Sequence, residues 1–144
     1  MEPAHEQFGQ EFAARIIARD YAAAHGLLSP WLQRAMTPEG LQGIIEARLT
    51  EMMEAAECDT LTYPVGCQID GNSSSLEFLR QPRSYAPARP IPAGVTDGNF
   101  RQWMSLQFLA GERLAIDAWF DLWMILAEDG GKLGVGYFEL TDPD

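Results

Sequence analysis

The sequence predicts an α+β fold, in which N-terminal helices pack on a curved antiparallel sheet that ends in a three-stranded meander. Helical periodicity in the first 57 residues and period-two alternation after residue 100 carry this prediction. Prolines and glycines fill the stretch between them. A length of 144 residues fits a single domain over 1–144, with helices at about 4–57, an irregular proline-rich segment at 58–99 and the meander at 100–141.

The helical part divides into four helices. Apolar residues and one histidine recur at helical spacing in the first, namely His5, Phe8, Phe12, Ile16 and Ile17. Asp20 is suited to cap a short second helix over 21–28. Ser29-Pro30 and Thr37-Pro38 each place a hydroxyl before a proline, which predicts a third helix and then a long fourth helix that ends near Glu57.

Residues 58–99 contain five prolines and are expected to hold little regular structure. Short strands are predicted around 65–69 and 76–79, joined as a hairpin by a Gly-Asn-Ser turn. The stretch from Gln81 to Val95 is predicted to run extended along the surface.

The meander begins with two alternating stretches, 100–109 and 116–128, whose even and odd positions lie on opposite faces. The even face is predicted to pack on the helices and includes Phe100, Gln102, Met104, Phe108 and Phe120. A tight turn at Asp129-Gly130-Gly131 leads to the last strand. Counting across that turn adds Val135, Tyr137 and Glu139 to the even face, and it adds Gly134, Gly136 and Phe138 to the odd face of Trp103, Trp119 and Trp123.

The charge balance excludes several classes of partner. The chain has 21 acidic and 10 basic residues, a net charge of −11, which argues against nucleic acid and against anionic membranes. The N-terminus lacks the pattern of a signal peptide, so a cytoplasmic location is expected. Cys58 and Cys67 fit no metal motif and are expected to be reduced thiols, with a bridge between them as the alternative for an exported protein. No metal and no cofactor is predicted.

The opening residues FAARIIARDYAAAHGLLSPWLQRAMTPEGL resemble nuclear transport factor 2-like domains. The likeness lies in an Asp-Tyr-x-x-Ala step, formed by Asp20, Tyr21 and Ala24, and in a Thr-Pro-Glu-x-Leu helix entry that starts at Thr37. It covers residues 5–57 in pattern and 100–141 in architecture, but not 58–99. It implies a cone-shaped α+β domain with a pocket between the sheet and the helices, which some members use for isomerase or dehydratase chemistry and others for ligand binding or dimerisation.

Within such a pocket, Glu139 and Tyr137 are the candidate catalytic residues, because a carboxyl group among apolar walls suits proton transfer and a phenol can stabilise an oxyanion. In the alternative interpretation, Glu139 lies at the sheet rim in water and Tyr137 is a core aromatic residue. The Tyr-plus-Asp pattern of ketosteroid isomerases has no counterpart here. The candidate ligand-binding residues are Gln102, His5, Met104 and Phe120.

The odd face predicts an interface, since Trp103, Trp119, Trp123 and Phe138 would form an exposed apolar patch. A homodimer is the first interpretation, and cover by residues 81–95 of the same chain is the alternative. Asp117 and Asp121 are expected to be solvated charges beside these tryptophans.

Three arginines, Arg80, Arg83 and Arg89, lie close together in a stretch without acidic residues. They are expected either to bind an anionic ligand or to pair with the glutamates of the long helix.

We therefore expect a non-catalytic domain that binds a small ligand or forms a homodimer through its tryptophan face. An isomerase or dehydratase that uses Glu139 and Tyr137 is the alternative. A second alternative is an acidic inhibitor of a basic protein partner.

Overall fold

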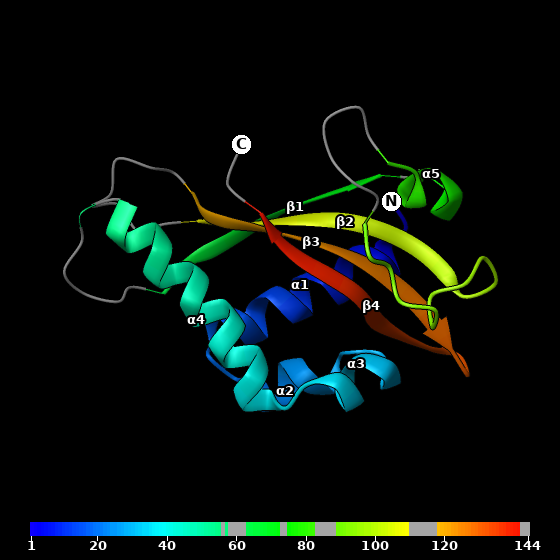
Figure 1. Ribbon diagram of the computed structural model, residues 1–144, viewed down its shortest axis with the longest axis horizontal. Coiled ribbons are helices and arrows are strands. Elements are labelled where there is room, and N and C mark those ends of the chain that lie inside the picture. The colour runs from blue at the N-terminus through cyan, green and yellow to red at the C-terminus, as the bar shows by residue number, and fades with distance from the viewer. Residues whose placement is uncertain (56, 58–62, 73–74, 83–88, 110–117, 142–144) are drawn as a thin grey trace.

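The computed structural model describes residues 1–55, 57, 63–72, 75–82, 89–109 and 118–141. These residues form the predicted α+β fold, with N-terminal helices packed on an antiparallel sheet (Figure 1). The helices α1–α4 lie on one side of the sheet, and the short helix α5 lies on the other side (Figure 1).

The four N-terminal helices follow the predicted boundaries closely. They are α1 (Pro3–Ile17), α2 (Tyr21–Gly26), α3 (Pro30–Ala35) and α4 (Pro38–Ala55). The Asp20 side chain caps α2 by accepting a hydrogen bond from the amide of Ala23 at 3.2 Å. Thr37 caps α4 in the same way, through a 3.0 Å bond from the amide of Gly40 to its hydroxyl. Side-chain caps therefore mark the starts of α2 and α4, whereas α1 and α3 begin at a proline and the preceding Glu2 and Ser29 make no side-chain cap hydrogen bond.

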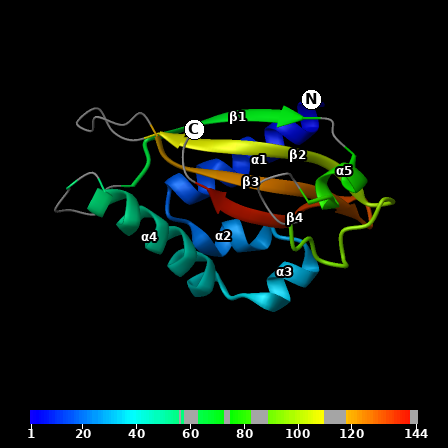
Figure 2. The ribbon, with the colours of Figure 1, turned by 45° about the horizontal axis from the view of Figure 1, so that its top comes forward.

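Within the described residues the strands form one antiparallel sheet in the order β1-β2-β3-β4 (Figure 2). They are β1 (Gly66–Asn72), β2 (Phe100–Leu109), β3 (Ala118–Asp129) and β4 (Lys132–Thr141). The predicted meander of the last three strands is confirmed. Gly130 and Gly131 make its final turn with φ of 58° and 79°, the left-handed values that a two-residue hairpin loop requires.

The predicted hairpin between 65–69 and 76–79 is wrong. The first stretch is a strand, but it pairs with β2, and the second belongs to the helix α5 (Leu76–Arg80). The Ser75 hydroxyl accepts a hydrogen bond from the amide of Phe78 at 3.2 Å, so a helix cap begins α5 where alternation had suggested a strand.

Apolar side chains pack on both faces of the sheet. The larger cluster lies between the sheet and α1–α4, where the Phe108 and Phe120 rings stack with their centroids 4.8 Å apart. The smaller cluster lies on the other face and joins Leu76 and Leu79 of α5 with Val95, Trp123, Ile125 and Tyr137. Both faces of β3 are therefore buried from Phe120 to Ala127.

The face prediction for the end of β4 is wrong, because the β3–β4 pairing shifts register by one residue at Gly136. An extra residue in one strand moves every later side chain to the opposite face. Tyr137 and Glu139 consequently lie on the face of Trp123, and Phe138 packs against the helix-side cluster. A second shift at Arg101 likewise moves Phe100 to the face of Trp123.

The prediction that both cysteines are reduced thiols can be compared with the structure only at Cys67, because Cys58 lies outside the described residues. Cys67 is a free, partly buried thiol on β1. Burial, and secondarily the Asp121 carboxylate, raises the pKa of the Cys67 thiol to about 12. The side chain is therefore a thiol rather than a reactive thiolate at neutral pH.

Candidate functional site: an apolar groove beside the last strand

An apolar groove with a volume of about 400 Å³ lies beside β4. Residues 137–140 of that strand line it, together with Leu32, Met36 and Ile44 from the helix side. Pro90 and Pro92, from the proline-rich segment, line it as well. The groove thus joins parts of the chain that are far apart in sequence.

The break between α3 and α4 places apolar side chains on the helix side of the groove. Helix α3 ends at Ala35 and α4 begins at Pro38. Met36 therefore lies at the end of α3, whereas Ile44 lies on α4. Ile44 is 40% exposed, whereas its neighbour Ile45 is fully buried in the core. Ile44 therefore presents apolar surface to the groove that the described residues leave partly exposed.

The α2–α3 linker forms hydrogen bonds with the first half of β4 and leaves the outer edge of its second half to the groove. The amide of Ser29 donates to the carbonyl of Val135, and the amide of Val135 donates to the carbonyl of Leu27, both at 2.9 Å. The Trp31 indole also donates to the carbonyl of Gly136 at 2.7 Å. These bonds occupy the outer edge of β4 at Val135 and Gly136, and the groove begins at the next residue.

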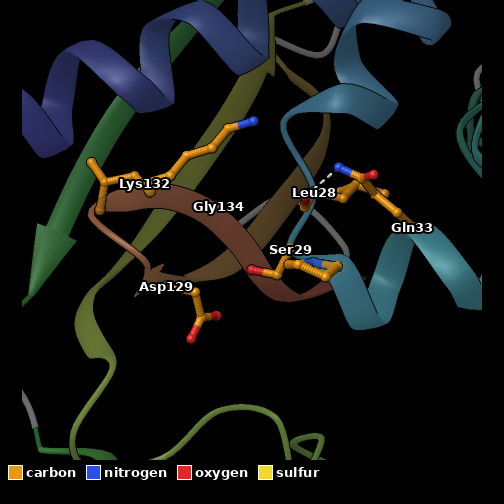
Figure 3. Close-up of a pocket in the computed structure, with 8 residues that line it drawn as sticks. Leu28, Ser29, Gln33, Asp129, Lys132 and Gly134 are labelled. Carbon is orange, nitrogen blue, oxygen red and sulfur yellow. Dashed lines mark hydrogen bonds between the residues drawn. The ribbon is translucent and has the colours of Figure 1, made fainter.

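A smaller cavity of about 80 Å³ lies where this linker meets the β3–β4 hairpin (Figure 3). Gln33 and Ser29 line it from the helix side, and Asp129 and Lys132 line it from the hairpin (Figure 3). The Gln33 amide donates to the carbonyl of Leu28 at 2.8 Å, so this amide group is already hydrogen-bonded to the α2–α3 linker. The volume suits a few water molecules rather than an organic ligand.

A hydrogen-bonded network forms the polar part of the larger groove. The Tyr137 hydroxyl donates to Glu139 Oε2 at 2.8 Å, and Arg89 Nε donates to Glu139 Oε1 at 2.8 Å. The Arg89 guanidinium also stacks over the Trp123 ring, 4.0 Å from its centroid. Burial, and secondarily the hydrogen bond to Glu139, raises the pKa of Tyr137 above its usual value, so the phenol keeps its proton.

The two candidate catalytic residues are therefore in contact, on the face opposite to the one predicted. Glu139 is not a solvated rim residue, since its side chain is only 26% exposed. Both of its oxygens already accept a hydrogen bond, one of them from a guanidinium. This arrangement holds the carboxylate in place through one hydrogen bond to each oxygen, and each oxygen keeps its second acceptor position.

The arginine expectations are only partly met. Arg89 pairs with Glu139 on β4 rather than with the glutamates of α4. Arg80 donates to the backbone carbonyl of Val95 at 2.6 Å, which ties α5 to the proline-rich segment. Arg83 lies outside the described residues.

The prediction of an exposed tryptophan face is wrong for its central residue, because Trp123 is only 6% exposed. Leu76, Leu79 and Val95 cover it together with Arg89, so α5 and the described part of the 81–95 segment supply the cover. Trp103 is half-buried beside it, with ring centroids 5.5 Å apart. The Trp119 side chain lies outside the described part of the chain.

The two aspartates of that face do not appear as the predicted solvated pair. Asp121 is only 7% exposed, because it lies on β3, which is flanked by β2 and β4 in a sheet that is covered on both faces. Asp117 lies outside the described residues.

No protein-family model, no curated protein and no solved structure matches the chain. The resemblance to nuclear transport factor 2-like domains stays a prediction. In the part of the chain that the structure describes, no helix combines the length and the apolar character that crossing a membrane requires.

The residues predicted to bind a ligand from inside the cone lie elsewhere than the groove. Met104 and Phe120 are fully buried, and Gln102 and His5 are 8% and 7% exposed. His5 Nε2 lies 3.3 Å from a carboxylate oxygen of Glu2, which directly precedes α1. Apolar side chains fill the space between sheet and helices, so a ligand there would displace part of the core.

The groove residues that sequence reasoning missed had one weak signal. Ile44 lies at the margin of the apolar side of α4. A large aliphatic side chain at that position, beside the core rather than in it, indicates a contact with another part of the structure. Pro90 and Pro92 offered no comparable sign, because a proline-rich stretch predicts an extended segment but not the surface it follows.

Proposed function

We propose that this protein is a non-catalytic binding domain that holds a small, mostly apolar molecule in the groove beside β4. Small-molecule pockets commonly enclose about 300–1,000 Å³ and combine apolar walls with a few placed polar groups. The observation that carries the proposal is a groove of about 400 Å³ whose polar side chains are the linked pair Tyr137 and Glu139.

The state of Glu139 favours binding over catalysis. An isomerase or dehydratase needs a carboxyl group that gains and loses a proton in each turnover. Glu139 is instead fixed by an ion pair with Arg89 and a hydrogen bond from Tyr137, and the guanidinium also stacks on the Trp123 ring. The helices-before-sheet order also supports membership of the nuclear transport factor 2-like group as part of this proposal, since that group includes ligand-binding domains.

The uncharged fluorophore N-phenyl-1-naphthylamine tests the proposal. We expect its emission to rise and saturate as the protein is titrated in, because apolar walls replace water around the dye. Ile44→Gln should weaken the binding by about fivefold, since it removes apolar surface from the groove without touching the buried core.

Phe78→Gln is the matched control. Phe78 is 64% exposed on α5 and does not line the groove, so its substitution should leave the dye affinity unchanged. The proposal fails if the emission does not saturate. It also fails if Phe78→Gln weakens the binding as much as Ile44→Gln does.

A further inference from the structure

In the described part of the chain, the side chains that line the groove can accept hydrogen bonds but have none to donate. Among the described residues of the lining, Tyr137 and Glu139 carry the polar side chains. The hydroxyl hydrogen of Tyr137 is directed to Glu139 Oε2, and a carboxylate has no hydrogen of its own. What these side chains leave for a ligand is a lone pair on the phenol oxygen and the second acceptor positions of the two carboxylate oxygens.

The polar part of the groove is also electrically balanced. Arg89 forms a 2.8 Å ion pair with Glu139 and is itself only 14% exposed, so the charge of the carboxylate is cancelled within the protein. A cationic ligand would have to compete with a guanidinium that also stacks on Trp123. An anionic ligand would find the guanidinium already paired with Glu139, in a chain of net charge −11. Both kinds of charged ligand are disfavoured on these grounds.

We infer that the groove selects an uncharged apolar molecule that donates one hydrogen bond, such as an alcohol or a phenol, to the Tyr137–Glu139 pair. This inference rests on the function proposed above and adds the chemical class of the ligand. Apolar contacts with Met36, Ile44 and the two prolines supply affinity for the body of the molecule. The Tyr137–Glu139 pair selects ligands whose polar group is a hydrogen-bond donor. A ligand without a donor would displace water from the pair without replacing its hydrogen bonds.

Three naphthalene derivatives of similar size separate the contribution of the hydrogen-bond donor from the effects of apolar contact and charge. The full-length protein is titrated with 2-naphthol, 2-methoxynaphthalene and 2-naphthoate at neutral pH, and binding is followed by the amide chemical shifts of residues 137–140. We expect the phenol to bind about tenfold more tightly than its methyl ether, the effect of one hydrogen bond to a charged acceptor. The carboxylate should bind most weakly of the three.

A substitution at Glu139 should reverse this order. Glu139→Gln introduces a donor and leaves the Arg89 charge unbalanced, so naphthoate should gain affinity relative to naphthol. Glu128→Gln is the matched control, since Glu128 forms an ion pair with Arg101 away from the groove and its loss should leave the order as in the wild type.

The outcomes separate this inference from the function on which it rests. Equal binding of the phenol and the ether would overturn the inference while groove binding stands. So would a carboxylate that binds as tightly as the phenol to the wild type. Failure of all three compounds to shift residues 137–140 would overturn the proposed function itself.

Discussion

Arg19 combines a strained backbone with a stabilising side-chain contact. It follows α1 with a φ of 60°, the left-handed conformation that is costly for residues other than glycine. Its guanidinium lies 3.7 Å from the centroid of the Tyr63 ring. Arg19→Ala keeps the strain and loses the cation–π contact, whereas Arg19→Gly loses the contact but relieves the strain.

We therefore expect the Arg19→Gly variant to be more stable than the Arg19→Ala variant by about 1 kcal/mol, despite the greater flexibility of glycine in the unfolded chain. Urea unfolding of both variants and the wild type measures the three free energies of unfolding. An alanine variant as stable as the glycine variant would contradict the role assigned to the backbone at this residue.

Glu46 predicts a pH dependence of stability. It accepts a 2.5 Å hydrogen bond from the Tyr63 hydroxyl, which is the largest cause that lowers the pKa of Glu46 below its ordinary 4.5. Because the folded-state pKa is the lower one, this stabilisation is present above pH 4.5 and is lost as the pH falls through the folded-state value. The Tyr63→Phe variant lacks the bond.

The difference in unfolding free energy between wild type and Tyr63→Phe should hence stay constant from neutral pH down to about 4.5 and shrink below it. Urea titrations at a series of pH values measure this difference. Glu46→Gln provides the control, because its own stability should lack this contribution at every pH. A difference that is unchanged in acid would show that the bond does not depend on the ionised carboxylate.

At the scale of single elements, locally encoded features were predictable and long-range ones were not. Asp20 and Thr37 cap helices through atoms three residues away, so their sequence neighbours sufficed. The face of Tyr137 depended on a register shift at Gly136, which arises between strands. The groove was harder still, because it unites β4, two helices and Pro90 without a shared local pattern.

The close approach of the α2–α3 linker to β4 needs a glycine at position 134. A Cβ added to Gly134 would lie 2.8 Å from the Ser29 hydroxyl and 3.1 Å from its backbone nitrogen. Gly134→Ala should push the linker away from the strand and weaken its hydrogen bonds to Val135, which we expect to lower the free energy of unfolding by about 1–3 kcal/mol.

Gly43→Ala is the comparison for that experiment. Gly43 lies within α4 and its added Cβ would meet nothing within 4 Å, so alanine should stabilise the protein by about 0.5–1 kcal/mol. Thermal and urea unfolding of both variants measure the two effects. Equal effects of the two substitutions would mean that the linker does not require its close contact with β4.

At the scale of the whole molecule, cover on both faces of the sheet changes what its tryptophans can do. Helices α1–α4 cover one face, and α5 with residues 89–95 covers part of the other. Trp123 lies under this second cover, between Arg89, Trp103 and the edge of the Tyr137 ring. An aromatic side chain in that position stabilises the fold of its own chain, and it offers little surface to a second copy.

Trp123→Asp therefore distinguishes a folding role from a dimer interface. Placing a carboxylate among buried apolar side chains and removing the indole should cost about 3–5 kcal/mol, a large share of the stability of a domain this size. We expect a large fall in the melting temperature by circular dichroism, and a smaller fall for Trp103→Ala, whose side chain is half-buried. Light scattering after gel filtration reports the mass at the same time. A variant that stays folded with an unchanged melting temperature while its mass halves would show that Trp123 faces a second copy, because a side chain buried within its own chain cannot be replaced by a carboxylate without lowering the stability of that chain.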